Sequence, residues 1–224
     1  MDLIREQFPI VIHSLNIGFL QTLKLFFVTL IGALPLGLVI SFGTTSRFKP
    51  VRAVINTIVW LFRGTPLMIQ LLIIYYFPGL VLHNPVWGGG ETGRFTAAAV
   101  SFILNYACYF AVIYRGGIQS VPKGQEEAGL VLGMTKRQIF CRIKLMQMIK
   151  NIVPPMSNEI ITLVKDTSLA YALSVEELFF MANKQTNANG VITPLIIAGI
   201  YYYFFNLLLS LLFRFIEKKL NYYK

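Results

Sequence analysis

Charged residues are scarce in this chain, and acidic ones are the rarer kind. Of its 224 residues only 13% are Asp, Glu, Lys or Arg, whereas a soluble globular protein usually carries about 25%. Hydrophobic residues make up 55% of the chain, and they stand in long blocks rather than at the spacing of an amphipathic helix. This composition argues against a soluble globule and favours one membrane-spanning domain over residues 1–224.

Cysteine and histidine are also rare, and they share no motif spacing. Cys108 lies in an apolar block, Cys141 lies in a basic stretch, and His13 and His83 stand alone. We therefore expect packing cysteines and solvated or interfacial histidines, with no disulfide and no metal site. No Gly is followed by Lys, so the chain lacks a phosphate-binding loop. The chain is predicted to bind no cofactor and to have no catalytic constellation.

The net charge of +10 does not indicate a nucleic-acid partner. Nucleic-acid binders collect Lys and Arg on a soluble face, but here the basic residues alternate with apolar blocks, as in membrane loops. Residues 1–13 also lack the order of basic, apolar and small residues that a cleavable signal needs. We therefore expect the lipid bilayer as the setting and the first membrane segment as the insertion signal.

Five stretches contain the roughly 20 apolar residues that a helix needs to cross a bilayer. They cover about residues 15–42, 54–82, 95–114, 152–173 and 191–213. Arg63-Gly64-Thr65-Pro66 interrupts the second stretch, and the fourth contains Glu159, Lys165 and Asp166. The sequence therefore predicts an all-α, polytopic membrane protein with five transmembrane helices.

The basic residues predict how these helices are oriented. If the five stretches alternate in direction, 14 Lys and Arg residues fall on one side, and three (Arg5, Arg94 and Lys184) fall on the other. Cytoplasmic connections carry the excess of basic residues. The sequence thus predicts a multi-pass protein of a bacterial cell membrane, with its N-terminus outside and its C-terminus in the cytoplasm.

The third connection, residues 116–151, is longer than a helix hairpin requires; we call it the long connection. Pro122 suits a first helical position, and Gly133 fits a helix C-terminal cap. Thr135-Lys136-Arg137-Gln138 has the pattern of a capping box that opens a second helix. Two short helices are therefore predicted. The residues alone favour neither of two roles, a helix lying on anionic lipid or a docking element for a soluble partner.

The long connection resembles the EAA signature of permease subunits of ABC importers. Glu127-Ala128-Gly129, Gly133 and Ile143-Lys144-Leu145 stand at the spacing of that signature. Gly129 replaces its second Ala, and Met146 replaces its Pro. The resemblance implies a cytoplasmic coupling helix between transmembrane helices 3 and 4 that docks on an ATPase subunit. Its contact residues would be Glu127, Ala128, Gly129 and Gly133.

Two further motifs narrow the resemblance. Arg63-Gly64-Thr65-Pro66-Leu67 with Gln70, and Asn158-Glu159 followed by Lys165-Asp166-Thr167-Ser168-Leu169, are similar to motifs of polar amino-acid permeases of the histidine, glutamine and arginine type. The resemblance implies two ATPase subunits that bind ATP-Mg, and a second permease subunit, either the same chain or a homologue. It also implies an external substrate-binding protein and an amino-acid substrate.

Charged side chains inside a membrane helix cost about 2.5 to 3.5 kcal/mol each on insertion scales, and they usually face a cavity or one another. Glu159 and Asp166 are seven residues apart, so they share a helix face with Thr162. Either Lys165 and Arg63 neutralise these carboxylates and hold helices together, or the polar groups line a substrate path. The candidate path residues are Glu159, Lys165, Asp166, Arg63, Thr65, Gln70, Thr162 and Ser168, with Asn105 as a further hydrogen-bonding group.

Three classes of protein fit buried charge in a membrane chain: an ABC importer permease, a gradient-driven secondary transporter and a membrane-embedded enzyme. Five helices form no internal inverted repeat, which argues against the second class. Glu126 and Glu127 have no His or metal partner, which argues against the third. The motifs favour a permease that forms the path for a polar amino acid. The identity of that amino acid, and the choice between homodimer and heterodimer, stay open.

Overall fold

The computed structural model describes residues 2–220, and within that range the chain is helical and contains no strand. The three longest helices are α1 (Asp2–Thr44), α4 (Gly90–Gln119) and α9 (Thr193–Leu220), and each is long and apolar enough to cross a membrane. They extend past the apolar stretches that the sequence marks, because their polar ends continue the same helices. The all-helical prediction is confirmed.

The second predicted span is split into α2 (Lys49–Gly64) and α3 (Leu67–Leu80). Together the two helices are long and apolar enough for one span, but the chain bends by 111° at the break between them. The fourth predicted span forms α7 (Leu145–Asp166) and the 3-10 helix η2 (Thr167–Leu173). The predicted span 152–173 is not apolar enough to count as a span by length and composition, and it carries the three charged residues Glu159, Lys165 and Asp166. Length and composition therefore give three to four spans rather than five.

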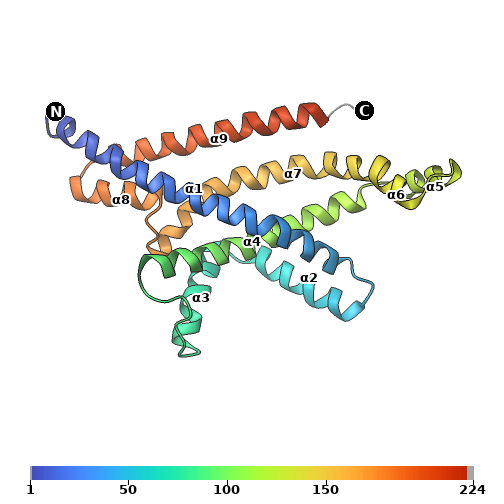
Figure 1. Ribbon diagram of the computed structural model, residues 1–224. Coiled ribbons are helices and arrows are strands. Elements are labelled where there is room, and N and C mark those ends of the chain that lie inside the picture. The colour runs from blue at the N-terminus through green and yellow to red at the C-terminus, as the bar shows by residue number, and fades with distance from the viewer. Residues whose placement is uncertain (1, 221–224) are drawn as a thin grey trace.

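The core of the bundle is the crossing of α1 and α4, which pack on each other over the greatest length (Figure 1). Glycines on α1 allow this close approach. A Cβ at Gly37 would lie 2.8 Å from Cβ of Phe110 and 2.9 Å from the carbonyl oxygen of Ala107, both on α4. Phe26 of α1 and Phe102 of α4 are fully buried in the hydrophobic core that the two helices share. α7 and α9 lie along one side of this pair, and α3 projects away from it.

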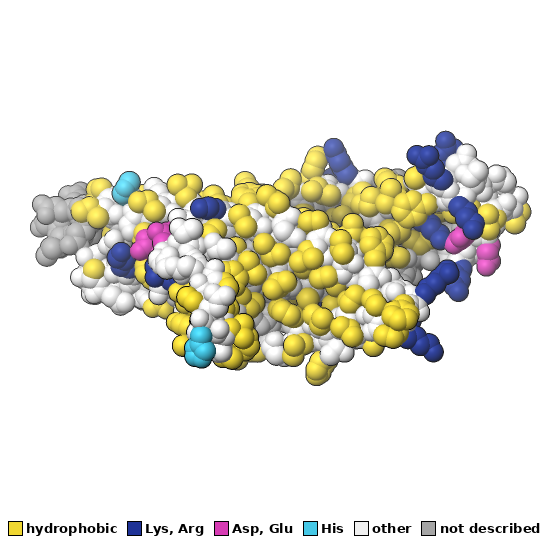
Figure 2. Space-filling view, turned by 60° about the horizontal axis from the view of Figure 1, so that its bottom comes forward, with side chains coloured by type: hydrophobic (Ala, Val, Ile, Leu, Met, Phe, Trp, Pro, Cys, Tyr) yellow, Lys and Arg dark blue, Asp and Glu magenta, His cyan; other side chains and the backbone are white. Residues whose placement is uncertain are grey.

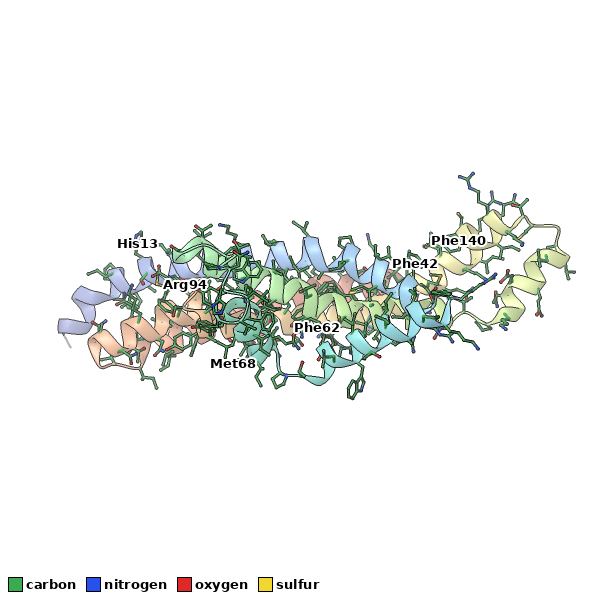
Figure 3. All side chains as sticks on the ribbon, turned by 90° about the horizontal axis from the view of Figure 1, so that it is seen from below. His13, Phe42, Phe62, Met68, Arg94 and Phe140 are labelled. Atoms are coloured by element: carbon green, nitrogen blue, oxygen red, sulfur yellow. The ribbon has the colours of Figure 1, made fainter. Side chains whose placement is uncertain are left out.

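The break between α2 and α3 falls at the predicted interruption, and the side chain of Gln70 stabilises it. Gln70 Nε2 donates to the carbonyl oxygens of Phe62 (2.8 Å) and Thr65 (3.0 Å), two acceptors that the broken helix leaves free. A helix break inside a membrane protein is tolerated where neighbouring groups satisfy its backbone in this way. In Figure 3, α3 is seen nearly end on, and Phe62 and Met68 lie on opposite sides of the break.

The structure adds a helix, α8 (Leu178–Asn189), in a region for which no element was predicted. Its N-cap is Glu177, a fully buried residue whose carboxylate accepts hydrogen bonds from the backbone amides of Phe179 (2.8 Å) and Phe180 (2.7 Å). Tyr202 of α9 donates its hydroxyl to the same carboxylate at 3.0 Å. The amide of Leu178 donates to Thr22 Oγ1 of α1. These bonds join α8 to both α1 and α9.

The long connection folds into α5 (Lys123–Val131), α6 (Lys136–Ile139) and a π-helical turn, η1 (Phe140–Lys144), which runs directly into α7. The predicted capping box between Thr135 and Gln138 is present. Gly133 has φ +72°, the left-handed conformation that glycine adopts at a helix end. Pro122 is predicted to be the first helical residue, but it is the N-cap of α5, and the helix begins one residue later at Lys123. Two short helices at a glycine turn are confirmed.

Candidate functional site

A cavity of about 300 Å³ lies where α4, α7 and the α2–α3 break meet. We call it the central cavity. Three helical segments that are far apart in the sequence supply its wall. The lining residues are Thr65, Pro66, Leu67, Asn105, Tyr106, Tyr109, Glu159, Thr162, Asp166 and Leu169. Polar and aromatic groups therefore converge inside an otherwise apolar bundle.

Two carboxylates, Glu159 and Asp166, line this cavity together with Thr162, as their shared helix face predicts. Tyr106 of α4 donates its hydroxyl to Asp166 Oδ2 at 2.7 Å. In residues 2–220 no Lys or Arg lies within ion-pair distance of either carboxylate. Lys165 and Arg63 therefore form no direct ion pair with these groups in the described residues, and act on them only as more distant charges. Sequence reasoning missed Tyr106, because a tyrosine in an apolar stretch gives no signal of its own.

The two predicted cations are not part of the cavity wall. The guanidinium carbon of Arg63 lies 5.1 Å from the ring centroid of Tyr109, a cation–π contact. Lys165 is exposed, and the hydroxyl of Ser168 donates to its backbone carbonyl at 2.7 Å. The cavity lining is therefore formally negative rather than of mixed charge.

Thr65, Gln70 and Asn105 form one hydrogen-bonded group beside the cavity. Gln70 Nε2 donates to Thr65 Oγ1 (2.8 Å), and Asn105 Nδ2 donates to Gln70 Oε1 (2.9 Å). Thr65 and Asn105 reach the cavity wall, whereas Gln70 does not. The amide of Gln70 is thus used to fix the break, and through it the position of Thr65.

The N-terminus of α3 opens at the cavity, since Pro66 and Leu67 are lining residues. The amides of Ile69 and Gln70 donate to the carbonyl oxygen of Pro66. In the described part of the chain, the amides of Leu67 and Met68 donate to no acceptor. A helix N-terminus carries a partial positive charge and binds anions through such amides. The cavity thus places one electropositive helix end near two carboxylates.

The predicted contact residues of the long connection lie around the turn between α5 and α6. Glu126 and Lys144 form an ion pair across its two arms, and the hydrogen bond from Lys144 lowers the pKa of the Glu126 carboxyl. Gly129 is buried against Ile139, where a Cβ would lie 2.8 Å from Cγ1. Glu127, Ala128 and Gly133 are exposed. The arms are therefore fixed to each other, and one face is left open.

The tip of α5 is apolar and faces outward. Val131 and Leu132 are 88% and 78% exposed, and Leu130 is 50% exposed. Lys and Arg side chains gather at the same end of the molecule, while hydrophobic side chains cover its middle (Figure 2). Adjacent exposed apolar residues with a polar rim mark interaction sites.

Comparison with known proteins identifies the family. Residues 33–222 match the model of the binding-protein-dependent transport system inner membrane component. The L-cystine transport system permease protein TcyB of Bacillus subtilis (strain 168) is 37% identical, with 99% of this chain and 92% of that protein covered. The arginine transport system permease protein ArtQ of the same organism is 36% identical, with 96% and 94% covered.

Solved structures agree with the sequence comparison. A crystal structure of an amino acid ABC transporter with histidines has a chain with a TM-score of 0.81 and 31% identity, over 92% of this chain and 94% of that one. The MetNI methionine ABC transporter, at 19% identity and a TM-score of 0.66, shares the fold. This chain therefore belongs to the family of inner membrane components of binding-protein-dependent transport systems, as a transport permease subunit rather than an enzyme.

Proposed function

We propose that this chain forms the translocation path for a polar amino acid in an ABC importer, and that the substrate passes through the central cavity. The observation that carries this proposal is the pair of carboxylates, Glu159 and Asp166, which line the cavity and form no ion pair in the described residues. Intramembrane charges of this kind mark substrate pathways. Relatives named for cystine, arginine and glutamine transport support an amino-acid substrate.

The cavity offers complementary groups for both ends of an amino acid. The carboxylates of Glu159 and Asp166 suit an ammonium group, and the free amides at the start of α3 suit a carboxylate. Half-helix N-termini play this second role in transporters with broken helices. The cavity carries two negative charges, whereas an amino acid with a neutral side chain carries one positive charge, its α-ammonium. A second positive charge on the side chain would pair with the second carboxylate. We therefore propose that an amino acid with a cationic side chain is preferred.

Uptake by the reconstituted complex tests this function directly. The assembled importer, in liposomes with ATP at its ATPase side, is supplied with a substrate-loaded binding protein and radiolabelled arginine, glutamine or glutamate. We expect ATP-dependent accumulation of arginine above that of glutamate. Accumulation of glutamate alone would contradict the proposed cation preference, and no ATP-dependent accumulation of any amino acid would contradict the function.

We further propose five transmembrane spans, counting the bent α2–α3 pair and α7 with η2 as one span each. The N-terminus is placed outside and the C-terminus in the cytoplasm. The gathering of basic side chains at the end that carries α5 and α6 supports this orientation. The two carboxylates on α7, Glu159 and Asp166, are compatible with a span because they face the central cavity rather than lipid.

Cysteine labelling is expected to place Gly89 outside and Cys141 inside. Gly89 has an ordinary φ of −96° and open space where a Cβ would lie, so Gly89→Cys introduces no strain. Cys141 is an exposed native thiol on the long connection, and Cys108 is buried. In intact cells an impermeant maleimide should label Gly89→Cys in a Cys141→Ser background. It should label native Cys141 only after permeabilisation. The opposite pattern would reverse the proposed topology.

The proposed complex contains two ATPase subunits that bind ATP-Mg, a second permease subunit (this chain or a homologue) and an external binding protein. The apolar tip of α5 supports docking of the ATPase here, because a tip that ends in Leu130, Val131 and Leu132 needs a partner to cover it. Glu127 and Ala128 lie exposed beside that tip. We propose that this face of the long connection couples ATP hydrolysis to transport.

Glu127→Ala and Gly133→Leu are expected to uncouple ATP hydrolysis from transport. Glu127 loses a charged contact, and a Leu at φ +72° adds strain of about 1–2 kcal/mol at the turn. Uptake should fall about 10- to 100-fold, while membrane insertion stays normal, because a docking contact to a charged group contributes roughly 1.5–3 kcal/mol. Uptake and substrate-stimulated ATPase activity are measured on the same proteoliposomes. Glu176→Ala, which removes a carboxylate from another part of the chain, is the matched control.

A further inference from the structure

A second groove, of about 480 Å³, lies between the start of α7 and the end of α9. Three basic residues line it, Lys150 from α7 and Arg214 and Lys218 from α9. Glu217 is the one acidic lining residue, and Val153 and Pro154 supply an apolar wall. The groove is therefore positively charged at one end of two membrane helices.

The groove sits where α9 changes from apolar to charged. The apolar run of α9 ends at Phe213, and Arg214 follows. Leu207, Leu211, Arg214 and Lys218 recur at spacings of four, three and four residues, which places them on one helix face. Leu207 is 39% exposed and Leu211 is 55% exposed. One face of α9 thus presents an exposed apolar track that ends in two cations.

The cations of this face have no counter-ion within the described residues. Neither the Arg214 guanidinium nor the Lys218 ammonium forms an ion pair in residues 2–220. The neighbouring Lys219 differs, because its ammonium lies 4.7 Å from the ring centroid of Phe215 and it does not line the groove. An arginine guanidinium binds phosphate oxygens in a bidentate manner, and a lysine adds a point charge.

We propose that this groove is a binding site for an anionic phospholipid. The headgroup phosphate contacts Arg214 and Lys218, and one acyl chain runs along Leu207 and Leu211. Basic pockets between membrane helices bind anionic headgroups in this way. Free phosphate has the same charged group as the headgroup, but it has no acyl chain to contact the apolar track. The track therefore favours a lipid over free phosphate. The bound lipid lies against α9 and faces the α7 wall of the groove, which Val153 and Pro154 supply.

The test is a titration of phosphatidylglycerol into the assembled, detergent-solubilised importer, with bound lipids counted by native mass spectrometry. The double variant Arg214→Gln/Lys218→Gln should bind phosphatidylglycerol about 30-fold more weakly than the native complex. The matched control Lys219→Gln removes the same kind of charge from the same helix turn and should bind as the native complex does. Glu217→Gln removes the one like charge beside the phosphate and should bind more tightly. This last variant keeps the test decisive if the double variant fails to assemble.

Three outcomes would overturn the proposal. Equal losses in Lys219→Gln and in the double variant would show general attraction to a basic surface. Displacement of phosphatidylglycerol by inorganic phosphate would show a phosphate site in place of a lipid site. Unchanged affinity in Glu217→Gln, together with unchanged affinity in the double variant, would show that no lipid binds here.

Discussion

Asp166→Asn is expected to reduce uptake by about 10- to 100-fold while leaving the importer assembled. The asparagine keeps the shape of the side chain, and its oxygen still accepts the hydrogen bond from Tyr106, which is 2.7 Å in the native protein. Only the charge that pairs with the substrate ammonium is lost, and a hydrogen bond to a charged group contributes about 1.5–3 kcal/mol. Glu159→Gln, which changes the second carboxylate of the cavity, should have an effect of the same sign.

Thermal unfolding of the solubilised complex distinguishes binding from a structural role. If the carboxylates held helices together by ion pairs, neutralising one would lower stability by about 3–5 kcal/mol, as for a broken buried pair. Because no such pair exists in residues 2–220, we expect the unfolding temperature to stay near the native value. Substrate should no longer raise it. Glu176→Gln is the matched carboxylate-to-amide control. A destabilised Asp166→Asn complex with native substrate affinity would contradict the proposed site.

Glu177→Ala is expected to destabilise the assembled protein by about 3 kcal/mol, with no direct effect on substrate affinity. The variant removes the N-cap of α8, which is worth roughly 0.5–2 kcal/mol. It also removes the carboxylate that accepts the hydrogen bond of the half-buried Tyr202 hydroxyl, which costs about 1–3 kcal/mol. The loss should appear as a lower unfolding temperature and as faster proteolysis within α8, since that carboxylate joins α8 to α9.

The neighbouring carboxylate provides the control for this prediction. Glu176 is half-buried, and its nearest cation, Lys184, is 3.9 Å away, so Glu176→Ala should change stability by less than about 1 kcal/mol. Glu177→Gln keeps an acceptor for the amides of α8 and should recover part of the loss. If Glu176→Ala and Glu177→Ala were equally stable, the N-cap at Glu177 would contribute nothing measurable to the stability of the protein.

Local signals in the sequence predicted several elements well. The Gly64–Pro66 interruption, the capping box at Thr135 and the left-handed turn at Gly133 each depend on residues within a few positions of one another. The shared face of Glu159 and Asp166 likewise follows from helix periodicity within α7. Features of this kind need no knowledge of the tertiary fold.

Contacts between distant segments could not be predicted in the same way. Tyr106 meets Asp166 across 60 positions, and Glu177 receives the hydroxyl of Tyr202 from another helix. Neither tyrosine differs in sequence context from one that only packs against apolar neighbours. The 111° bend between α2 and α3 was missed for a related reason, since a Pro predicts a break but not the direction in which the chain leaves it.

α4 and α7 flank the long connection in the chain, and both helices also line the central cavity. They therefore connect the long connection directly to the cavity. α4 carries Tyr109 about 15 Å from its end at Gln119, and α7 carries Glu159 about 21 Å from its start at Leu145. Because α4 contains no proline, we expect it to behave as a stiff rod. α7 contains Pro154 and Pro155, which remove two backbone hydrogen bonds, so we expect this helix to bend more easily at that point. We therefore expect a displacement of the long connection to move the carboxylates of α7 relative to the aromatic rings of α4.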